Sequence, residues 1–269
     1  MNTFLKNIAI VGSLVAGLNV AHATECTPEY TVTTIKEGVL SVALTNTPPY
    51  SFEQDRHIAG IDGDLVNKFA QNNCLTVEYS IFTYPAAVSA VQSGRADIAL
   101  GGFYRTAARQ RVVALSTPAY LDQLAVQSVE GYDTVDQLIG KNVGTVEGYD
   151  WVQQMEEVIP GSKTYPSSLN LAQDVQAGRL DAGLEGFGAA VNLTKGKNMQ
   201  VKLLQPDPRI NATTLASQTS FLLSKKNQGL LDAMNNTLES YRADGTIGNV
   251  LEAHGLPASA AEVGEERNI

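Results

Sequence analysis

Apolar residues along the chain follow two alternating periods, one typical of strands and one typical of helices. A strand is predicted over residues 39–44, a helix over 62–73 and a second strand over 75–82, and the same alternation starts afresh from about Gly131. Because strands and helices alternate in both halves, the pattern predicts an α/β fold with mainly parallel sheets and helices on both faces.

One stretch of twelve residues occurs twice with little change. Residues 92–103 read QSGRADIALGGF and residues 176–187 read QAGRLDAGLEGF, so both follow Q-x-G-R-x-D-x-x-L-x-G-F. In each copy a glycine suited to positive φ would end a helix, and a short apolar strand would follow. The repeat predicts two similar α/β lobes, each bringing one strand end to a shared place. The alternative is that two unrelated helix-to-strand turns share the residues that turns prefer.

Two long extended runs, over 119–129 and 217–223, predict the connections between these lobes. Ligands of open α/β sheets bind outside the carboxyl ends of the strands. Two facing sheets joined by two hinge strands would therefore enclose a ligand cleft that can close. We expect a division into lobe 1 over residues 24–122 plus 222–256, lobe 2 over 123–221, and an unstructured tail over 257–269.

The first 23 residues are typical of an export signal. Lys6 precedes an uncharged run over residues 8–21, and Ala21-His22-Ala23 has the small-x-small pattern of a cleavage site. The run is shorter than the ~20 residues that a spanning helix needs, which disfavours the alternative of a membrane anchor. Cys26 is not at a lipoprotein acceptor position, because two residues separate it from Ala23. We expect cleavage after Ala23 and a soluble exported protein.

Charge and cysteine content narrow the range of partners. The formal net charge of −9 becomes −10 once residues 1–23 are removed, and either value disfavours nucleic acid and anionic membranes. The two cysteines, Cys26 and Cys74, are expected to form a disulfide in an exported protein, with two free thiols as the alternative. This bond would tie the new N-terminus to the end of the first long helix. The three histidines lack the spacing of a metal or catalytic site, so we expect no metal or cofactor.

Three short motifs resemble those of one family of exported proteins. Residues 60–65, GIDGDL, resemble a signature of glycine and alternating acids. Residues 106–109 resemble T-x-x-R, and residues 242–246 resemble a terminal R-x-D-G-T. In this order the chain resembles the family 3 solute-binding proteins of polar-amino-acid ABC importers. The resemblance implies the two-lobed type II periplasmic-binding-protein fold, a monomer in the periplasm, and delivery of a small solute to a membrane permease.

The resemblance also assigns roles to single residues. Arg109 matches the arginine that clamps the ligand carboxylate, and a guanidinium can do so with two charge-assisted hydrogen bonds. The alternative, a solvated helix charge, is expected for Arg105 and Arg111 instead. Tyr50 and Tyr84 resemble the aromatic walls around the ligand, with ordinary core packing as the alternative.

Other candidates come from both halves of the chain. Gly102 and Tyr104 match positions that supply backbone and hydroxyl contacts, and Asn46 lies in the proline-rich loop after the first strand. Tyr104 replaces a small polar residue, which implies a narrower pocket. Tyr149 and Asp150 begin a predicted helix whose N–H groups would face the carboxylate. Asp150 is unexpected there, because its charge would repel an anion.

The second copy of the repeat departs from the family pattern. The family has an aspartate near the end of this strand that binds the ligand's α-amino group, and the matching position is Gly186. Glu185 or Asp150 could take this role, and the alternative for Glu185 is a solvated acid at the rim. We therefore expect a small zwitterion or carboxylate as the ligand, such as a polar amino acid or a derivative.

An enzyme on the same scaffold is the alternative function. Cyclohexadienyl dehydratases, which act on prephenate or arogenate, resemble this family and need a carboxylic general acid in the cleft. Just beyond the second repeat strand the chain offers only Gly188 and Ala189, which argues against such an enzyme. Glu185 keeps the alternative open.

Overall fold

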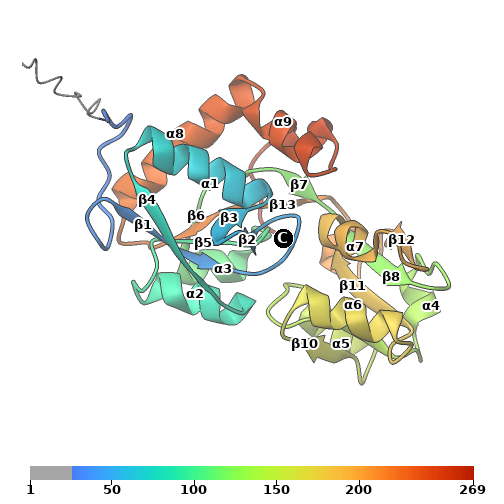
Figure 1. Cartoon of the computed structure of the whole chain (residues 1–269). Helices are drawn as coiled ribbons and strands as arrows, with labels where there is room; N and C mark the ends of the chain where they lie inside the picture. The colour runs from blue at the N-terminus through green and yellow to red at the C-terminus, as the bar shows by residue number, and fades with distance from the viewer. Residues whose placement is uncertain (1–25) are drawn as a thin grey trace, which may run out of the picture.

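The computed structural model describes residues 26–269, so the predicted export signal lies outside the described residues. Two five-stranded sheets, each with its own helices, form the two lobes, and both connections between them pass through the middle of the molecule (Figure 1). None of the helices within residues 26–269 combines the length and the apolar character needed to cross a membrane.

The first sheet has the strand order β4-β1-β5-β14-β6. Its strands are β1 (Val39–Leu44), β4 (Thr76–Ile81), β5 (Ile98–Leu100), β6 (Ala114–Leu115) and β14 (Leu222–Leu223). The helices of this lobe are α1 (Ile61–Asn72), α2 (Tyr84–Gln92), α3 (Ala107–Val112), α8 (Gln228–Ala243) and α9 (Thr246–Ala253). Side chains of β1 alternate between faces: Leu40, Val42 and Leu44 pack with α1 and α8, whereas Ala43 packs with α2. Phe52–Gln54 (β2) and His57–Ala59 (β3) form a small hairpin before α1.

The second sheet has the order β10-β9-β11-β8-β12. Its strands are β8 (Leu124–Ser128), β9 (Val143–Val146), β10 (Lys163–Tyr165), β11 (Ala182–Gly186) and β12 (Gln200–Leu203). Its helices are α4 (Val135–Leu138), α5 (Val152–Val158), α6 (Ser168–Gln176) and α7 (Phe187–Thr194), followed by the 3-10 turn η1 (Asn211–Thr213).

Each sheet is mixed: four of its five strands run in one direction, in line with the prediction of mainly parallel sheets, and one strand is reversed. β1 pairs in parallel with β4 and β5, but β14 is antiparallel to both of its neighbours. In the second sheet β8 is antiparallel to β11 and β12. Both β8 and β14 come just after a connection between the lobes, and the chain enters each sheet there in the direction opposite to its neighbours.

The two connections run side by side as an antiparallel pair. Strand β7 (Leu121–Asp122) pairs with β13 (Ser217–Gln218), with Asp122 opposite Ser217. The predicted run over 217–223 is therefore two short strands rather than one. Figure 1 shows this pair between the two lobes. Both lobes are thus hinged on the same two-stranded ribbon.

Both copies of the repeat have the predicted helix–turn–strand structure. Helix α2 ends at Gln92 before Gly94 at φ +74°, and α6 ends at Gln176 before Gly178 at φ +69°. The aspartate of each motif accepts a backbone N–H from the neighbouring strand or the residue just before it. Asp97 accepts the N–H of Ser41 on β1 at 2.9 Å, and Asp181 accepts the N–H of Asn142, just before β9, at 2.7 Å. Each repeat thus joins its own strand to the neighbouring one.

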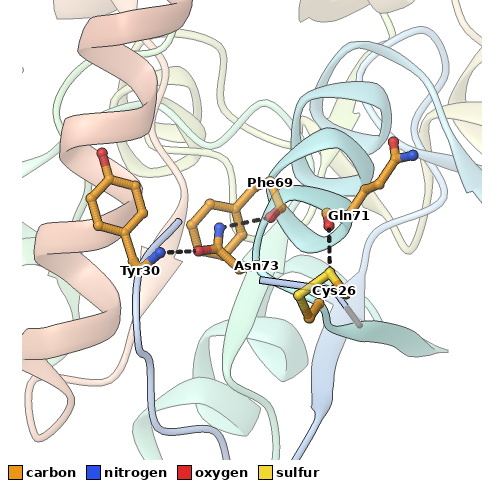
Figure 2. The surroundings of a disulfide bond; sticks show 6 residues. Cys26, Tyr30, Phe69, Gln71 and Asn73 are labelled. Atoms are coloured by element: carbon orange, nitrogen blue, oxygen red, sulfur yellow. Dashed lines mark hydrogen bonds between the residues drawn. A yellow bond between two sulfur atoms is a disulfide. The ribbon is translucent and has the colours of Figure 1, made fainter. Parts of the chain in front are cut away.

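The predicted disulfide between Cys26 and Cys74 is confirmed, with a Cα–Cα distance of 5.7 Å. It joins the N-terminal segment to the chain just after α1, as predicted. Figure 2 shows the adjoining contacts, in which the N–H of Tyr30 donates to Oδ1 of Asn73 at 2.7 Å and Nδ2 of Asn73 donates to the carbonyl of Phe69 at 2.8 Å. The N-terminal segment is therefore held at the end of α1 by covalent and hydrogen bonds.

The tail over 257–269 differs from the expected unstructured segment. It forms the 3-10 turn η2 (Ala258–Ala261) and then packs along β13, where Nε2 of Gln218 donates to the carbonyls of Val263 and Glu265 at 2.8 and 2.7 Å. Glu266 forms a salt bridge with Arg105, which is buried rather than solvated as expected. The tail therefore supplies acceptors for the amide of Gln218 and a counter-charge for Arg105, whose guanidinium also donates to the carbonyl of Ser116.

Candidate functional site

A small buried cavity lies between the lobes, next to the hinge. Its volume is about 10 Å³, about the room that one water molecule needs. Eight of the nine predicted binding residues line it: Tyr50, Tyr84, Gly102, Tyr104, Arg109, Tyr149, Asp150 and Glu185. Asn46 is exposed and lies outside this cavity. Four lining residues were not predicted to bind: Phe103, Asp122, Trp151 and Gly186.

Arg109 reaches the cavity from the first turn of α3. Thr106 is the N-cap of this helix, and its hydroxyl accepts the N–H of Arg109 at 3.0 Å. The guanidinium donates to the carbonyl of Tyr104 at 2.6 Å and, across the lobe boundary, to the carbonyl of Gly148 at 3.0 Å. It also lies 5.2 Å from the centre of the Phe103 ring, a cation–π distance. Arg109 is thus a buried cation that touches both lobes.

Aromatic rings from the two lobes meet across the cavity. Tyr84, the first residue of α2, packs edge-on against Tyr149 of lobe 2, with ring centres 4.8 Å apart. Trp151 lies 4.8 Å from Tyr149 and 5.7 Å from Tyr104. The hydroxyl of Tyr84 donates to the carbonyl of Gly101 at 2.6 Å. These contacts close the lobes on each other and fill most of the space between them.

Tyr50 and Tyr104 converge on Asp122 of the hinge strand β7. Their hydroxyls donate to Oδ2 of Asp122 at 2.6 and 2.7 Å. The Tyr50 hydroxyl also accepts the N–H of Ala189, at the start of α7, at 3.3 Å. Burial raises the pKa of the Asp122 carboxyl, and the two tyrosine donors oppose that shift. Loop, hinge and lobe 2 are therefore joined at this carboxylate.

A second buried carboxylate, that of Asp62, holds a loop that lines the cavity. Asp62, near the start of α1, accepts the N–H groups of Gly101 and Gly102 at 2.9 and 2.8 Å, and the hydroxyl of Tyr120 at 2.7 Å. Burial raises its pKa to about 6, against the effect of these donors. Asp62 therefore positions the loop that carries Gly102.

Glu185 is fully buried, so the reading of a solvated rim acid is wrong. Its Oε1 accepts the hydroxyl of Tyr149 at 2.5 Å and the N–H of Gly186 at 3.1 Å. Its Oε2 is buried and has no hydrogen-bond partner among the described residues. Burial raises the pKa of this carboxyl to about 7. Glu185 can therefore gain or lose a proton close to neutral pH.

Asp150 lies in the loop that closes onto lobe 1. Burial raises its pKa, and the nearby Arg109 charge opposes that shift. The expected helix start at residues 148–150 is about one turn too early, because α5 begins at Val152 with Trp151 as its N-cap. Tyr149 and Asp150 therefore precede α5, and their N–H groups do not belong to its first turn. Asp150 instead places a carboxylate beside Arg109.

The charges lining the cavity are unequal. Arg109 is the lining residue with a basic side chain, and Asp122, Asp150 and Glu185 are the acidic ones. Taken with ionised side chains, the lining has two more negative than positive charges. Asp122 had one signal in the sequence, since it is the acid within the apolar run predicted to cross between lobes. Within residues 26–269 no group of three or more His, Cys, Asp or Glu side chains could hold a metal ion.

Comparison with known protein families gives one match over most of the chain. The model of the bacterial extracellular solute-binding proteins, family 3, matches residues 40–256. The chain is similar to the L-cystine-binding protein TcyJ of Escherichia coli strain K12, with 26% identity over 245 residues, 87% of this chain and 88% of TcyJ. It is also 26% identical over 211 residues to the ABC transporter arginine-binding protein 1 of the same strain, covering 76% and 85% of the two chains.

A solved structure gives the same fold. The amino acid ABC transporter substrate-binding protein AbpA of Streptococcus pneumoniae, bound to L-arginine, superimposes with a TM-score of 0.72. The superposition covers 85% of this chain and 97% of AbpA at 22% identity. At this identity the likeness shows a shared two-lobed α/β architecture.

Proposed function

The chain belongs to the bacterial extracellular solute-binding proteins, family 3, and from this premise we propose that it binds a small amino-acid-like solute for an ABC importer. The solute is a zwitterion or a carboxylate, held between the lobes and then delivered to a membrane permease. Relatives named for cystine and arginine binding support this class of ligand.

The observation that carries this proposal is a buried guanidinium facing buried acids in one interlobe cavity. Arg109 supplies a fork of donors that suits a carboxylate. Asp122 and Glu185 supply acidic groups at the end of the second copy of the repeat, Glu185 from within it and Asp122 from the hinge beside it. A ligand with a carboxylate and a cationic group would complement both ends of such a site.

Binding requires the lobes to separate. A cavity of about 10 Å³ has no room for an amino acid, and Tyr84, Tyr149 and Arg109 close it by direct contacts. Because the chain crosses between the lobes at the ribbon of β7 and β13, rotation about this hinge would open the cavity by breaking the direct contacts across it. In the proposed cycle the ligand enters the open form, and its contacts replace those of Arg109 with the carbonyl of Gly148.

The same proposal includes location and organisation. The protein is exported with cleavage after Ala23, acts as a monomer in the periplasm, and is a carrier rather than an enzyme. Lobe 1 comprises residues 24–122 and 222–256, and lobe 2 comprises residues 123–221. The disulfide, which persists in oxidising compartments, supports the location.

A thermal-shift screen of residues 24–269 tests the proposal, because a ligand stabilises only the folded state that binds it. The probes are the twenty amino acids, L-cystine, hydroxyectoine and small carboxylates. We expect at least one zwitterion or carboxylate to raise the Tm, and Arg109→Ala to abolish that rise. Arg111→Ala, on the exposed side of the same helix, is the matched control. If no probe raises the Tm, the proposed ligand class is wrong.

One observation favours the dehydratase as a second candidate. The Glu185 carboxyl, whose pKa is about 7, is the kind of group that can act as a general acid near neutral pH. Against it, the first turn of α7 carries no acid in this cavity, only Gly188 and Ala189. Incubation with prephenate, followed by ultraviolet absorbance, distinguishes the two functions. Turnover that disappears in Glu185→Gln would establish the enzyme.

A further inference from the structure

We propose that Asp122, on the hinge strand β7, is the residue that binds the cationic group of the ligand. This inference rests on the proposed function and identifies the specificity-determining residue of the same site. The ligand class is a primary ammonium or another hydrogen-bonding cation, and a neutral or purely anionic solute lacks the matching charge.

The placement of Asp122 is the first argument. The residue is only 4% exposed, and its carboxylate lines the interlobe cavity. Its donors are the hydroxyls of Tyr50 and Tyr104 at Oδ2 and, more weakly, the N–H of Gly188 at Oδ1, 3.4 Å away. All of these donors are neutral. When it is ionised, a buried carboxylate with only neutral donors has no opposite charge beside it, so a cation is the partner that would compensate it.

Gly186 gives the second argument. A Cβ atom on Gly186 would lie 2.5 Å from Oδ2 of Asp122 and 2.8 Å from the hydroxyl of Tyr50. The backbone of Gly186, at φ −59°, is one that any residue adopts, so glycine is not needed there for its conformation. It is needed for space. The carboxylate of Asp122 occupies the place that a side chain at the end of β11 would otherwise fill.

Glu185 gives a third, independent argument. Its buried Oε2 has no hydrogen-bond partner among the described residues, and the charge of Asp122 contributes to the raised pKa of Glu185. Two acids, one from the hinge and one from lobe 2, therefore flank the position of Gly186. An ammonium group has three donors and can bond to both carboxylates at once. Charge-assisted bonds of this kind are the stronger class of hydrogen bond.

A purely structural role for Asp122 is the competing explanation, since Tyr50 and Tyr104 could use it only to hold the hinge. The two explanations differ in what they predict for ligand charge. A structural residue affects all ligands through stability, whereas a cation-binding residue affects only the ligands that carry the cation.

The test compares Asp122→Asn with the wild type by titration calorimetry at pH 8. The probes are L-cystine and L-glutamine, each paired with the analogue that lacks its α-amino groups and therefore carries no cation. For the probe that binds, we expect Asp122→Asn to weaken affinity by about 10- to 100-fold, the range for a hydrogen bond to a charged group. The des-amino analogue should bind both proteins equally. Asp97→Asn removes an equally buried acid outside the cavity and should lower Tm without this selectivity.

A second pair of variants keeps the test valid if Asp122→Asn folds poorly. Asp122→Gly should lose the preference for the amine-bearing probe, and Asp122→Gly with Gly186→Asp should regain it, because the carboxylate returns to the same space from β11. Gly186→Asp alone should be destabilised by the clash with Asp122.

The outcomes separate the two proposals. Equal loss for amine-bearing and des-amino probes would make Asp122 structural and overturn the inference while the proposed function stands. Wild-type binding of the des-amino probes alone would do the same. If neither kind of probe binds the wild type, the proposed function fails, and this inference fails with it.

Discussion

The hydroxyl of Tyr149 donates a hydrogen bond of 2.5 Å to Oε1 of Glu185, and both side chains lie in the cavity between the lobes. The ring of Tyr149 also packs against Tyr84 of lobe 1. Glu185 is therefore linked to the opposite lobe through the side chain of Tyr149. A carboxyl that titrates near neutral pH therefore belongs to the surface along which the lobes meet.

Stability of the ligand-free protein should fall as pH rises from about 4 to 8. Burial raises the pKa of Glu185 from 4.5 to about 7 and that of Asp62 from 3.8 to about 6. The folded state thus binds more protons than the unfolded state in this window, and the free energy of unfolding decreases with pH. Glu185 alone accounts for at most about 3 to 4 kcal/mol, at 1.36 kcal/mol per pKa unit. Urea unfolding at pH 5, 6, 7 and 8 measures this slope.

Glu185→Gln is the control for that slope. It removes the titrating group and leaves an amide oxygen that can accept the Tyr149 hydroxyl. We expect a flatter dependence on pH between 6 and 8, with the Asp62 contribution remaining below pH 6. A slope identical to that of the wild type would mean that Glu185 is not the group responsible.

Arg109→Lys should weaken the binding of a carboxylate ligand although it keeps the charge. A lysine ammonium cannot present the planar fork of a guanidinium. For the tightest carboxylate-bearing probe of the screen, we expect a loss of about 10- to 100-fold, the worth of one charge-assisted hydrogen bond. Titration calorimetry with that probe and with its α-amide gives the measurement. The α-amide, which lacks the charge, should distinguish the two proteins much less, and an equal loss for both would contradict the clamp.

The sequence predicted the lobes because their signals are local. Helix and strand periods and the glycines at 94 and 178 depend on neighbouring residues, and the structure has both repeats as helix, turn and strand. Strand direction in the sheets is not local. β8 and β14 run antiparallel to their neighbours because each follows a hinge crossing. The residues within either strand carry no signal of that direction.

Prediction of the site was limited in the same way. Arg109 carries a local signal, since Thr106 caps its helix. Asp122 becomes a cavity residue only when Tyr50, Tyr104 and Gly186 meet it from three separate segments. Local motifs therefore predicted Arg109 as a site residue, whereas the place of Asp122 in the cavity is visible only in the folded structure.

Replacing both cysteines by serine should destabilise the protein. The bond between Cys26 and Cys74 closes a separation of 48 residues, and closing such a loop stabilises by about 2–4 kcal/mol in the chain-entropy account. Chemical unfolding of the double variant and of the oxidised wild type gives the difference. Reduction of the wild type should reproduce it. An unchanged midpoint would show that the contacts of Tyr30 and Asn73 alone hold the N-terminal segment.

Removal of residues 263–269 should destabilise the protein through the hinge strand β13. The amide of Gln218, which is 2% exposed, loses its acceptors at Val263 and Glu265, and its oxygen loses the N–H of Arg267 at 2.8 Å. Arg105 loses Glu266. A buried polar group left without its partner costs about 1–3 kcal/mol, and a charged one costs more.

Point variants distinguish these contacts from a general effect of shortening the chain. Glu266→Gln removes the charge that faces buried Arg105, whereas Glu265→Gln changes a neighbouring exposed side chain and leaves its carbonyl bond to Gln218 intact. We expect a lower midpoint in urea for Glu266→Gln and for the truncation, and a wild-type midpoint for Glu265→Gln. The side chain of Glu266 is exposed, and solvent weakens its salt bridge with Arg105. The midpoint should therefore fall less for Glu266→Gln than for the truncation. Equal midpoints for all four proteins would mean that the tail lies on the hinge without stabilising it.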